Sequence, residues 1–233
     1  MTLPSSSHYT PSDNGKVLTI SSLNHTVDDS YYSCAATNNA GVGNFNATFH
    51  LQINYPPTTE VIHTKSWTPT EENAVTLTCD ITDGRPRSDI KKVTWKKGDI
   101  TLPTSGRFTL SDNDKVLEIS SLNHTVDDGH YSCAAHNEAR MGDFSVKLHL
   151  LVNFKPSVSV ETLGPVVEGE SKTIRCHSQG ARPAVTSVTW KKGQEVINVT
   201  TDSKYSGGTV ETPSLTTGSV LKTDAGEYTS TGQ

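Results

Sequence analysis

The sequence predicts an all-β protein made of antiparallel β-sandwiches in tandem. Three observations support this fold class: strand-length segments of alternating apolar and polar residues, a composition rich in Ser and Thr but only 6% aromatic, and an internal repeat 99 residues apart. The 233 residues therefore fit two to three small sandwiches better than one large core.

The repeat is visible as near-identical text. Residues 17–29 read VLTISSLNHTVDD, and residues 116–128 read VLEISSLNHTVDD. At the same shift, Tyr32-Ser33-Cys34 matches Tyr131-Ser132-Cys133, and a third, more divergent copy begins near Lys155. The chain therefore holds three related regions.

The middle copy divides into strands by its alternating pattern, as in the apolar positions Val75, Leu77 and Cys79. Strands are expected at residues 73–80, 92–96, 107–111, 116–120, 131–135 and 144–152. Residues 84–87 are expected to form a loop, and the DNDK segment at 112–115 predicts a hairpin turn.

Cysteine, tryptophan, aspartate and tyrosine keep a fixed spacing in the middle copy. Trp95 follows Cys79 by 16 residues, Cys133 follows Cys79 by 54, and the run from Asp127 to Cys133 reads D-x-G-x-Y-x-C. With the surrounding segment LPTSGRFTLSDNDKVLEISSLNHTVDDGHYSCAAHN, this motif resembles the tandem I-set and C2-type immunoglobulin domains of cell-adhesion proteins, including carcinoembryonic-antigen-type, nephrin-like and hemicentin-like domains. The resemblance implies a Cys79–Cys133 bridge between two sheets, with Trp95 packed on it and the Tyr131 hydroxyl tying the corner before strand F.

In the strand letters of that fold, the three copies differ in completeness. Residues 1–54 are expected to form a partial domain with strands C′ to G only, because the strand-B Cys and strand-C Trp are missing. Residues 55–153 are expected to form a complete domain, and residues 154–233 one that lacks strand G. This pattern predicts a fragment of a longer protein. Short, proline-containing joints at 54–57 and 153–156 predict semi-rigid connections.

The third copy departs from the motif at one cysteine. It keeps Trp190 and Tyr228 as core-signature residues, but Ser230 stands 54 residues after Cys176, where the second cysteine belongs. Cys34 in the first copy also lacks a partner in its own domain. A strand exchange between chains that links Cys34 to Cys176 is an alternative to two free thiols.

The resemblance also implies an ion pair at the corner between strands E and F. Arg107 and Asp127 match the two partners of this pair in the middle copy. His8 and Lys204 stand at the Arg107 position in the other two copies. We expect the pair to be structural rather than functional.

Four N-x-S/T sequons point to export. They are expected to be glycosylation sites, with ordinary turn-forming asparagine as the alternative, and they begin at Asn24, Asn46, Asn123 and Asn198. A structural disulfide likewise belongs to an oxidising compartment. We therefore expect an extracellular or cell-surface protein whose signal peptide and any anchor lie outside this sequence.

The candidate binding face lies on the outward side of strands C and F of the middle copy, where ligands of this fold class often bind. Its predicted members are Lys92, Thr94, Lys96, His130 and Ser132. The alternative is a solvated sheet face without a partner. We expect a protein partner, homophilic or heterophilic, and an adhesion or recognition module. A structural spacer array without a binding site is the alternative function.

Other function classes find little support in the sequence. The nine histidines show no zinc-ligand spacing, the His–Asp pairs of the repeats are better explained by the sequon and the corner, and no phosphate-binding glycine loop is present. We therefore expect no enzyme, catalytic residue, metal or cofactor. A net charge of −5 without a basic stripe argues against a nucleic-acid partner. No apolar run is long enough to span a membrane, so we expect no membrane contact within this segment.

Overall fold

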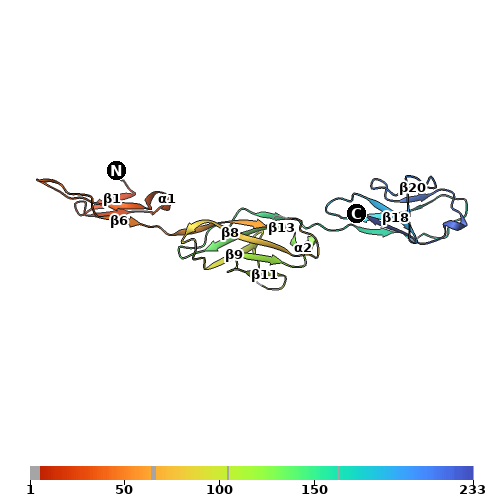
Figure 1. The fold of residues 1–233 in the computed structure, drawn as a ribbon, viewed down its shortest axis with the longest axis horizontal. Helices are drawn as coiled ribbons and strands as arrows, with labels where there is room; N and C mark the ends of the chain where they lie inside the picture. Colours follow the sequence, from red (N-terminus) through yellow and green to blue (C-terminus); the bar gives the residue numbers. More distant parts are fainter. Residues whose placement is uncertain (1–5, 64–66, 104, 162, 233) are drawn as a thin grey trace. The chain divides into compact units, whose positions relative to one another are not determined.

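The computed structural model describes residues 6–63, 67–103, 105–161 and 163–232 (Figure 1). Antiparallel strands dominate these residues, which confirms the all-β fold class. We name residues 6–54 the first region, 55–153 the middle region and 154–232 the third region. The predicted start of the first partial domain, residues 1–5, lies outside the described residues.

Internal contacts divide the chain into two units. The first unit takes the residues up to 64, 76–118 and 130–148, and the second takes 65–75, 119–129 and 149 onward. Each unit therefore includes one of the two joints between neighbouring regions.

The first region, in the first unit, is made of short paired strands. The strand β1 (Tyr9–Ser12) pairs with β2 (Val17–Ile20), β3 (Ser30–Ser33) with β6 (Thr48–Leu51), and β4 (Thr37–Asn38) with β5 (Gly41–Val42). The one-turn helix α1 (His25–Asp28) separates β2 from β3.

Two four-stranded sheets form the middle region (Figure 1). One sheet has the order β11 (Phe108–Ser111), β12 (Val116–Ile119), β8 (Val75–Arg85) and β7 (Tyr55–His63). The other has the order β10 (Ile100–Thr101), β9 (Lys92–Lys97), β13 (Gly129–His136) and β14 (Leu148–Leu150). A disulfide joins Cys79 of β8 to Cys133 of β13, so it links the two sheets as predicted.

The hairpin predicted at DNDK is present between β11 and β12. Asp112, Asn113 and Asp114 have φ angles of 50°, 53° and 66°, a left-handed conformation that Asn and Asp tolerate better than most residues. The Lys115 N–H donates to the Asp112 carbonyl at 3.0 Å and closes the turn.

Two predicted strand boundaries in the middle region are wrong. β8 continues to Arg85 rather than giving way to a loop at residue 84, because Arg85 pairs with Tyr55 and the buried Asn137 amide donates to both of their carbonyls, at 3.0 and 2.8 Å. The predicted long strand 144–152 is reduced to Leu148–Leu150. Upstream of it, the Ser145 hydroxyl accepts the Cys133 N–H at 3.1 Å in place of a backbone carbonyl.

The third region, in the second unit, has three small sheets. β15 (Ser157–Val160) pairs with β17 (Cys176–Gln179); β16 (Lys172–Ile174), β21 (Leu215–Thr217) and β20 (Tyr205–Gly207) form the second; β19 (Glu195–Ile197), β18 (Val188–Lys192) and β22 (Tyr228–Gly232) form the third. Its buried apolar cluster consists of Ile174, Cys176, Trp190 and Leu215. The second unit also contains the one-turn helix α2 (His124–Asp127) and a 3-10 turn, Lys222–Asp224.

Candidate functional site

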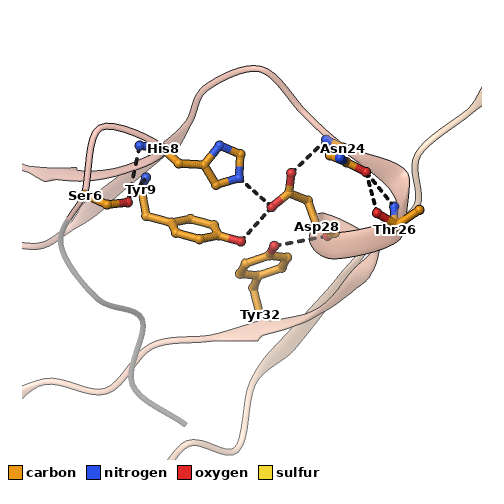
Figure 2. Close-up of polar contacts among 7 residues, drawn as sticks. All are labelled: Ser6, His8, Tyr9, Asn24, Thr26, Asp28 and Tyr32. Carbon is orange, nitrogen blue, oxygen red and sulfur yellow. Dashed lines mark hydrogen bonds and ion pairs between the residues drawn. The ribbon is translucent and has the colours of Figure 1, made fainter.

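The corner after α1 is built around one buried carboxylate, as Figure 2 shows. Asp28 accepts hydrogen bonds from the Tyr9 hydroxyl at 2.6 Å and the Asn24 N–H at 2.8 Å, and His8 Nε2 lies 2.8 Å from it. These contacts, the Tyr9 hydrogen bond first, lower the pKa of Asp28 to about 2. The Tyr32 hydroxyl donates to the Asp28 carbonyl at 3.0 Å and ties the corner to β3.

The same corner occurs in the third region. Asp224 pairs with Lys204 at 2.5 Å and accepts the Leu221 N–H at 2.7 Å, and these two contacts, in that order, lower its pKa. The Tyr228 hydroxyl donates to the Asp224 carbonyl at 3.0 Å. The tyrosine corner therefore recurs. The contacts of its aspartate with Lys204, Leu221 and Tyr228 all lie within the corner, which is a structural arrangement.

The residues at the Arg107 position contact the corner aspartate in the other two regions: His8 Nε2 lies 2.8 Å from Asp28, and Lys204 forms an ion pair with Asp224. In the middle region Asp127 is buried and accepts the Asn123 N–H at 2.7 Å. Its pairing with Arg107 stays a prediction.

Each tryptophan of the core signature is buried and makes a hydrogen bond that the sequence did not reveal. The indole N–H of Trp95 donates to the Asp114 carbonyl, and that of Trp190 to the Pro213 carbonyl, both at 2.8 Å. The register also corresponds, because Trp95 lies opposite Cys133 and Trp190 lies opposite Ser230.

The candidate binding face is only partly accessible. β9 alternates as predicted: Lys92 is exposed and Thr94 and Lys96 are half-buried, whereas Val93 and Trp95 are buried. These three outward side chains remain available to a partner.

On the neighbouring strand β13, His130 is exposed, but Ser132 and Ala134 are only 2% and 1% exposed. The prediction that Ser132 belongs to an accessible face is therefore wrong. Ser132 lies opposite Lys96, whose ammonium is 4.1 Å from the centre of the Phe144 ring, so longer side chains overhang this small residue.

All four sequon asparagines are exposed. At Asn24, Asn123 and Asn198 the amide oxygen accepts hydrogen bonds from the backbone N–H and the hydroxyl of the threonine two residues later, at 2.6 to 3.1 Å. These bonds use the amide oxygen, whereas a glycan is attached to the amide nitrogen. The turn-forming and glycan-carrying roles are therefore compatible at the same residue.

A second set of contacts, which we did not predict from the sequence, lies at the joints between regions. The aspartates that follow the corner, Asp29 and Asp128, pair with Arg85 and Arg182 of the next region. The signal was present, since both aspartates belong to the 99-residue repeat and both arginines precede a proline.

Among the described residues, no three or more His, Cys, Asp or Glu side chains gather as a metal site would require. Nor does any helix there have the length and apolarity needed to cross a bilayer.

Comparison with known families assigns the class of protein. Residues 59–152 match the immunoglobulin I-set domain, and residues 155–231 match a second immunoglobulin domain family. The chain belongs to the immunoglobulin superfamily.

Individual relatives are long, multidomain proteins. The chain is 28% identical to human (Homo sapiens) hemicentin-1 over 97% of its own length and 4% of that protein, and 28% identical to mouse (Mus musculus) neural cell adhesion molecule 1 over 76% of its length and 16% of that protein. Among solved structures, an E-to-A variant of titin domains I67–I69 aligns with a TM-score of 0.60 at 25% identity, covering 99% of this chain and 79% of that one. The chain thus spans only a small part of the curated relatives that it matches.

Proposed function

We propose that this chain is an extracellular adhesion or recognition module that acts through protein–protein contacts of tandem immunoglobulin domains. The observation that carries the proposal is the disulfide between Cys79 and Cys133 in an I-set region. Such bridges belong to oxidising compartments, where adhesion proteins work. A relative named for cell adhesion supports the same function. Catalysis is not part of the proposal, because this fold family is typically non-enzymatic.

The outward side of β9, with His130 of β13, is the proposed contact surface. Lys92, Thr94 and Lys96 project from β9, and His130 of β13 lies past its end, where the His130 carbonyl accepts the Gly98 N–H at 2.7 Å. Lysine stems and heads at a sheet face favour a partner that offers carboxylates at the rim of the interface. Asn24, Asn46, Asn123 and Asn198 are proposed glycosylation sites, and a loss of mass after enzymatic deglycosylation of secreted material tests them.

The test is a binding assay on the whole secreted chain. Beads coated with the chain should aggregate if contacts are homophilic, and should bind cells or a second coated protein if they are heterophilic. Lys92→Glu with Lys96→Glu should reduce either signal at least tenfold, because it reverses the charge of the face. Lys16→Glu, an exposed lysine in the β1–β2 turn, is the matched control and should have no effect.

A spacer array is the second candidate function. Its supporting observation is that the chain matches hemicentin-1 along nearly its whole length while spanning only 4% of that protein. A spacer predicts no aggregation and no cell binding at any concentration, with unchanged behaviour of the Lys92→Glu, Lys96→Glu variant. That result would contradict the adhesion proposal and leave the spacer.

A further inference from the structure

The two joints between neighbouring regions carry the same contacts, made by residues at almost the same spacing. At each joint an aspartate directly follows the buried corner aspartate: Asp29 follows Asp28, and Asp128 follows Asp127. The contacts of Asp29 lie within the first unit and those of Asp128 within the second. Each set can therefore be described inside one unit.

At the second joint, Asp128 holds both the linker and the next region. One carboxylate oxygen accepts the Val152 N–H at 2.7 Å, and the other pairs with Arg182 Nη1 at 2.5 Å. The same Nη1 donates to the Val152 carbonyl at 3.1 Å. Burial raises the pKa of Asp128, but the Val152 N–H and the guanidinium outweigh it and leave that pKa below its usual value.

An aromatic stack completes the second joint. His124 of α2 stacks on Phe154 with ring centres 3.7 Å apart and planes inclined by 10°. Phe154 and Arg182 exchange both backbone hydrogen bonds, at 2.8 and 3.0 Å, and the Arg182 guanidinium lies 5.7 Å from the centre of the Phe154 ring. On its other side, His124 Nδ1 lies 2.9 Å from Glu71.

The first joint repeats this arrangement. Asp29 Oδ2 pairs with Arg85 and also accepts the Ile53 N–H at 3.1 Å, whereas Asp128 uses one oxygen for each of the matching contacts. His25 stacks on Tyr55 with ring centres 3.8 Å apart and planes inclined by 13°, and Tyr55 lies opposite Arg85 in the ladder. His50, 3.3 Å from Asp29, is an addition of the first joint.

We propose that Asp29 and Asp128 each anchor a joint clamp that fixes the linker and the Arg-Pro turn of the following region to the preceding corner. The clamp consists of a histidine, an aspartate, an aromatic residue and an arginine: His25, Asp29, Tyr55 and Arg85 at the first joint, and His124, Asp128, Phe154 and Arg182 at the second.

Two arguments separate this clamp from chance surface pairing. An exposed ion pair contributes little by itself. Here the Asp side chains are only 15% and 25% exposed, and each carboxylate is shared between a guanidinium and a backbone N–H, an arrangement that strengthens hydrogen bonds to a charged acceptor. In addition, a histidine, an aspartate and an arginine meet an aromatic residue, Tyr or Phe, twice in one chain. The clamp acts within the chain, so it holds for an adhesion module and for a spacer alike.

Amide hydrogen exchange of the whole chain tests the second clamp. In Asp128→Asn, the Val152 and Phe154 amides should exchange about tenfold faster, because the carboxylate charge is lost and with it the ion pair to Arg182. Arg182→Lys keeps the charge but loses the planar guanidinium, whose Nη1 donates to both Asp128 and Val152, and should give a smaller acceleration. Arg175→Ala, which removes an exposed pair with Glu161 at 3.8 Å, is the matched control and should leave both amides unchanged.

A double-variant comparison separates a clamp from general loosening. Asp128→Asn combined with Arg182→Ala should accelerate Val152 exchange no more than the stronger single variant, since both remove one shared interaction. The Trp190 amide reports whether the third-region core is intact, and it should keep its wild-type rate in all variants. The proposal is overturned if Asp128→Asn changes Val152 and Phe154 exchange less than twofold, or if Arg175→Ala accelerates them equally. Asp29→Asn, read at Ile53, repeats the test at the first joint.

Discussion

The middle and third regions solve the same packing problem with different means. Both bury a tryptophan whose indole N–H is bonded to a backbone carbonyl, and both place a residue of the F strand directly opposite it. In the middle region that residue is the disulfide partner Cys133, whereas in the third region the Cys176 sulfur lies 3.4 Å from the Ser230 hydroxyl. The fold therefore forms around the tryptophan and the corner, and the bridge is a separable increment of stability.

The cores differ in a second respect. The position of Ile119, fully buried in the middle region, is taken by Thr217 in the third. A cavity of about 530 Å³, lined in part by Ile174, Thr217 and Tyr228, opens beside that threonine. With threonine in place of isoleucine, the third-region core buries less apolar surface and should contribute less to the free energy of unfolding than the middle-region core.

The largest expected effect comes from removing the difference at the bridge. Replacing both cysteines by serine, Cys79→Ser with Cys133→Ser, should destabilise the middle region by about 4 kcal/mol, because the unfolded chain regains the conformational entropy that a bridge across 54 residues removes. The loss in free energy of unfolding is measured by urea unfolding, monitored through the amide exchange of β8 and β13. Cys34→Ser, at an exposed free thiol, is the control. A loss below about 1 kcal/mol would show that the bridge matters little.

The reverse change should make the third region resemble the middle one. Ser230→Cys places a second thiol next to the Cys176 sulfur, and oxidation of the two thiols to a disulfide should raise the free energy of unfolding of the third region by about 2–4 kcal/mol. The measurement compares unfolding with and without reductant, together with a titration of free thiols. In Ser230→Ala, the free energy of unfolding of the third region should be the same with and without reductant. If oxidised Ser230→Cys is no more stable than its reduced form, the two regions do not share the same geometry at this site.

A smaller effect is expected from exchanging the core residues. Thr217→Ile adds apolar volume next to the cavity and should stabilise the third region by about 1 kcal/mol. The reciprocal variant, Ile119→Thr, should cost the middle region about 1–2 kcal/mol, since it buries a hydroxyl and leaves a void. Thermal unfolding of both variants provides the comparison. A destabilising effect of Thr217→Ile, or a stabilising effect of Ile119→Thr, would contradict the assignment of the two positions as equivalents.

The smallest expected effect is on acid sensitivity of the corners. The pKa of Asp224 is lowered by Lys204 and the Leu221 N–H, and that of Asp28 is lowered to about 2. An unfolded aspartate titrates near 3.9, so these groups bind more protons when unfolded. Their stabilisation is present above about pH 4. It is lost as the pH falls towards 2 for Asp28, and as the pH falls through the lowered pKa for Asp224.

The measurement is the free energy of unfolding between pH 5 and pH 2. Asp224→Asn should be less stable than the wild type at pH 5 and should lose part of the decline on acidification. Glu211→Gln, at an exposed carboxylate outside the corner, should decline as the wild type does. An unchanged decline in Asp224→Asn would remove this corner from the account of acid sensitivity.

Sequence reasoning recovered the features that depend on local pattern. The alternation along β9 and the DNDK hairpin follow from side-chain periodicity and turn chemistry, and the resemblance of the motif to immunoglobulin domains implies the pairing of Cys79 with Cys133. It failed where neighbouring strands decide exposure. Ser132 alternates outward on β13, yet it is buried because the side chains around it are longer.

The sequence by itself determined the fold class, the number of related regions and the identity of their buried tryptophans, because these depend on residue type at short or repeated spacing. Only the tertiary structure decided what the second aspartate of each corner does. Asp29 and Asp128 meet Arg85 and Arg182 across 56 and 54 residues of sequence, and side chains so far apart come together only when the intervening strands are folded. The repeated aspartate and the Arg-Pro dipeptide mark these residues in the sequence, but no local pattern pairs them, because the contact exists only in the folded chain.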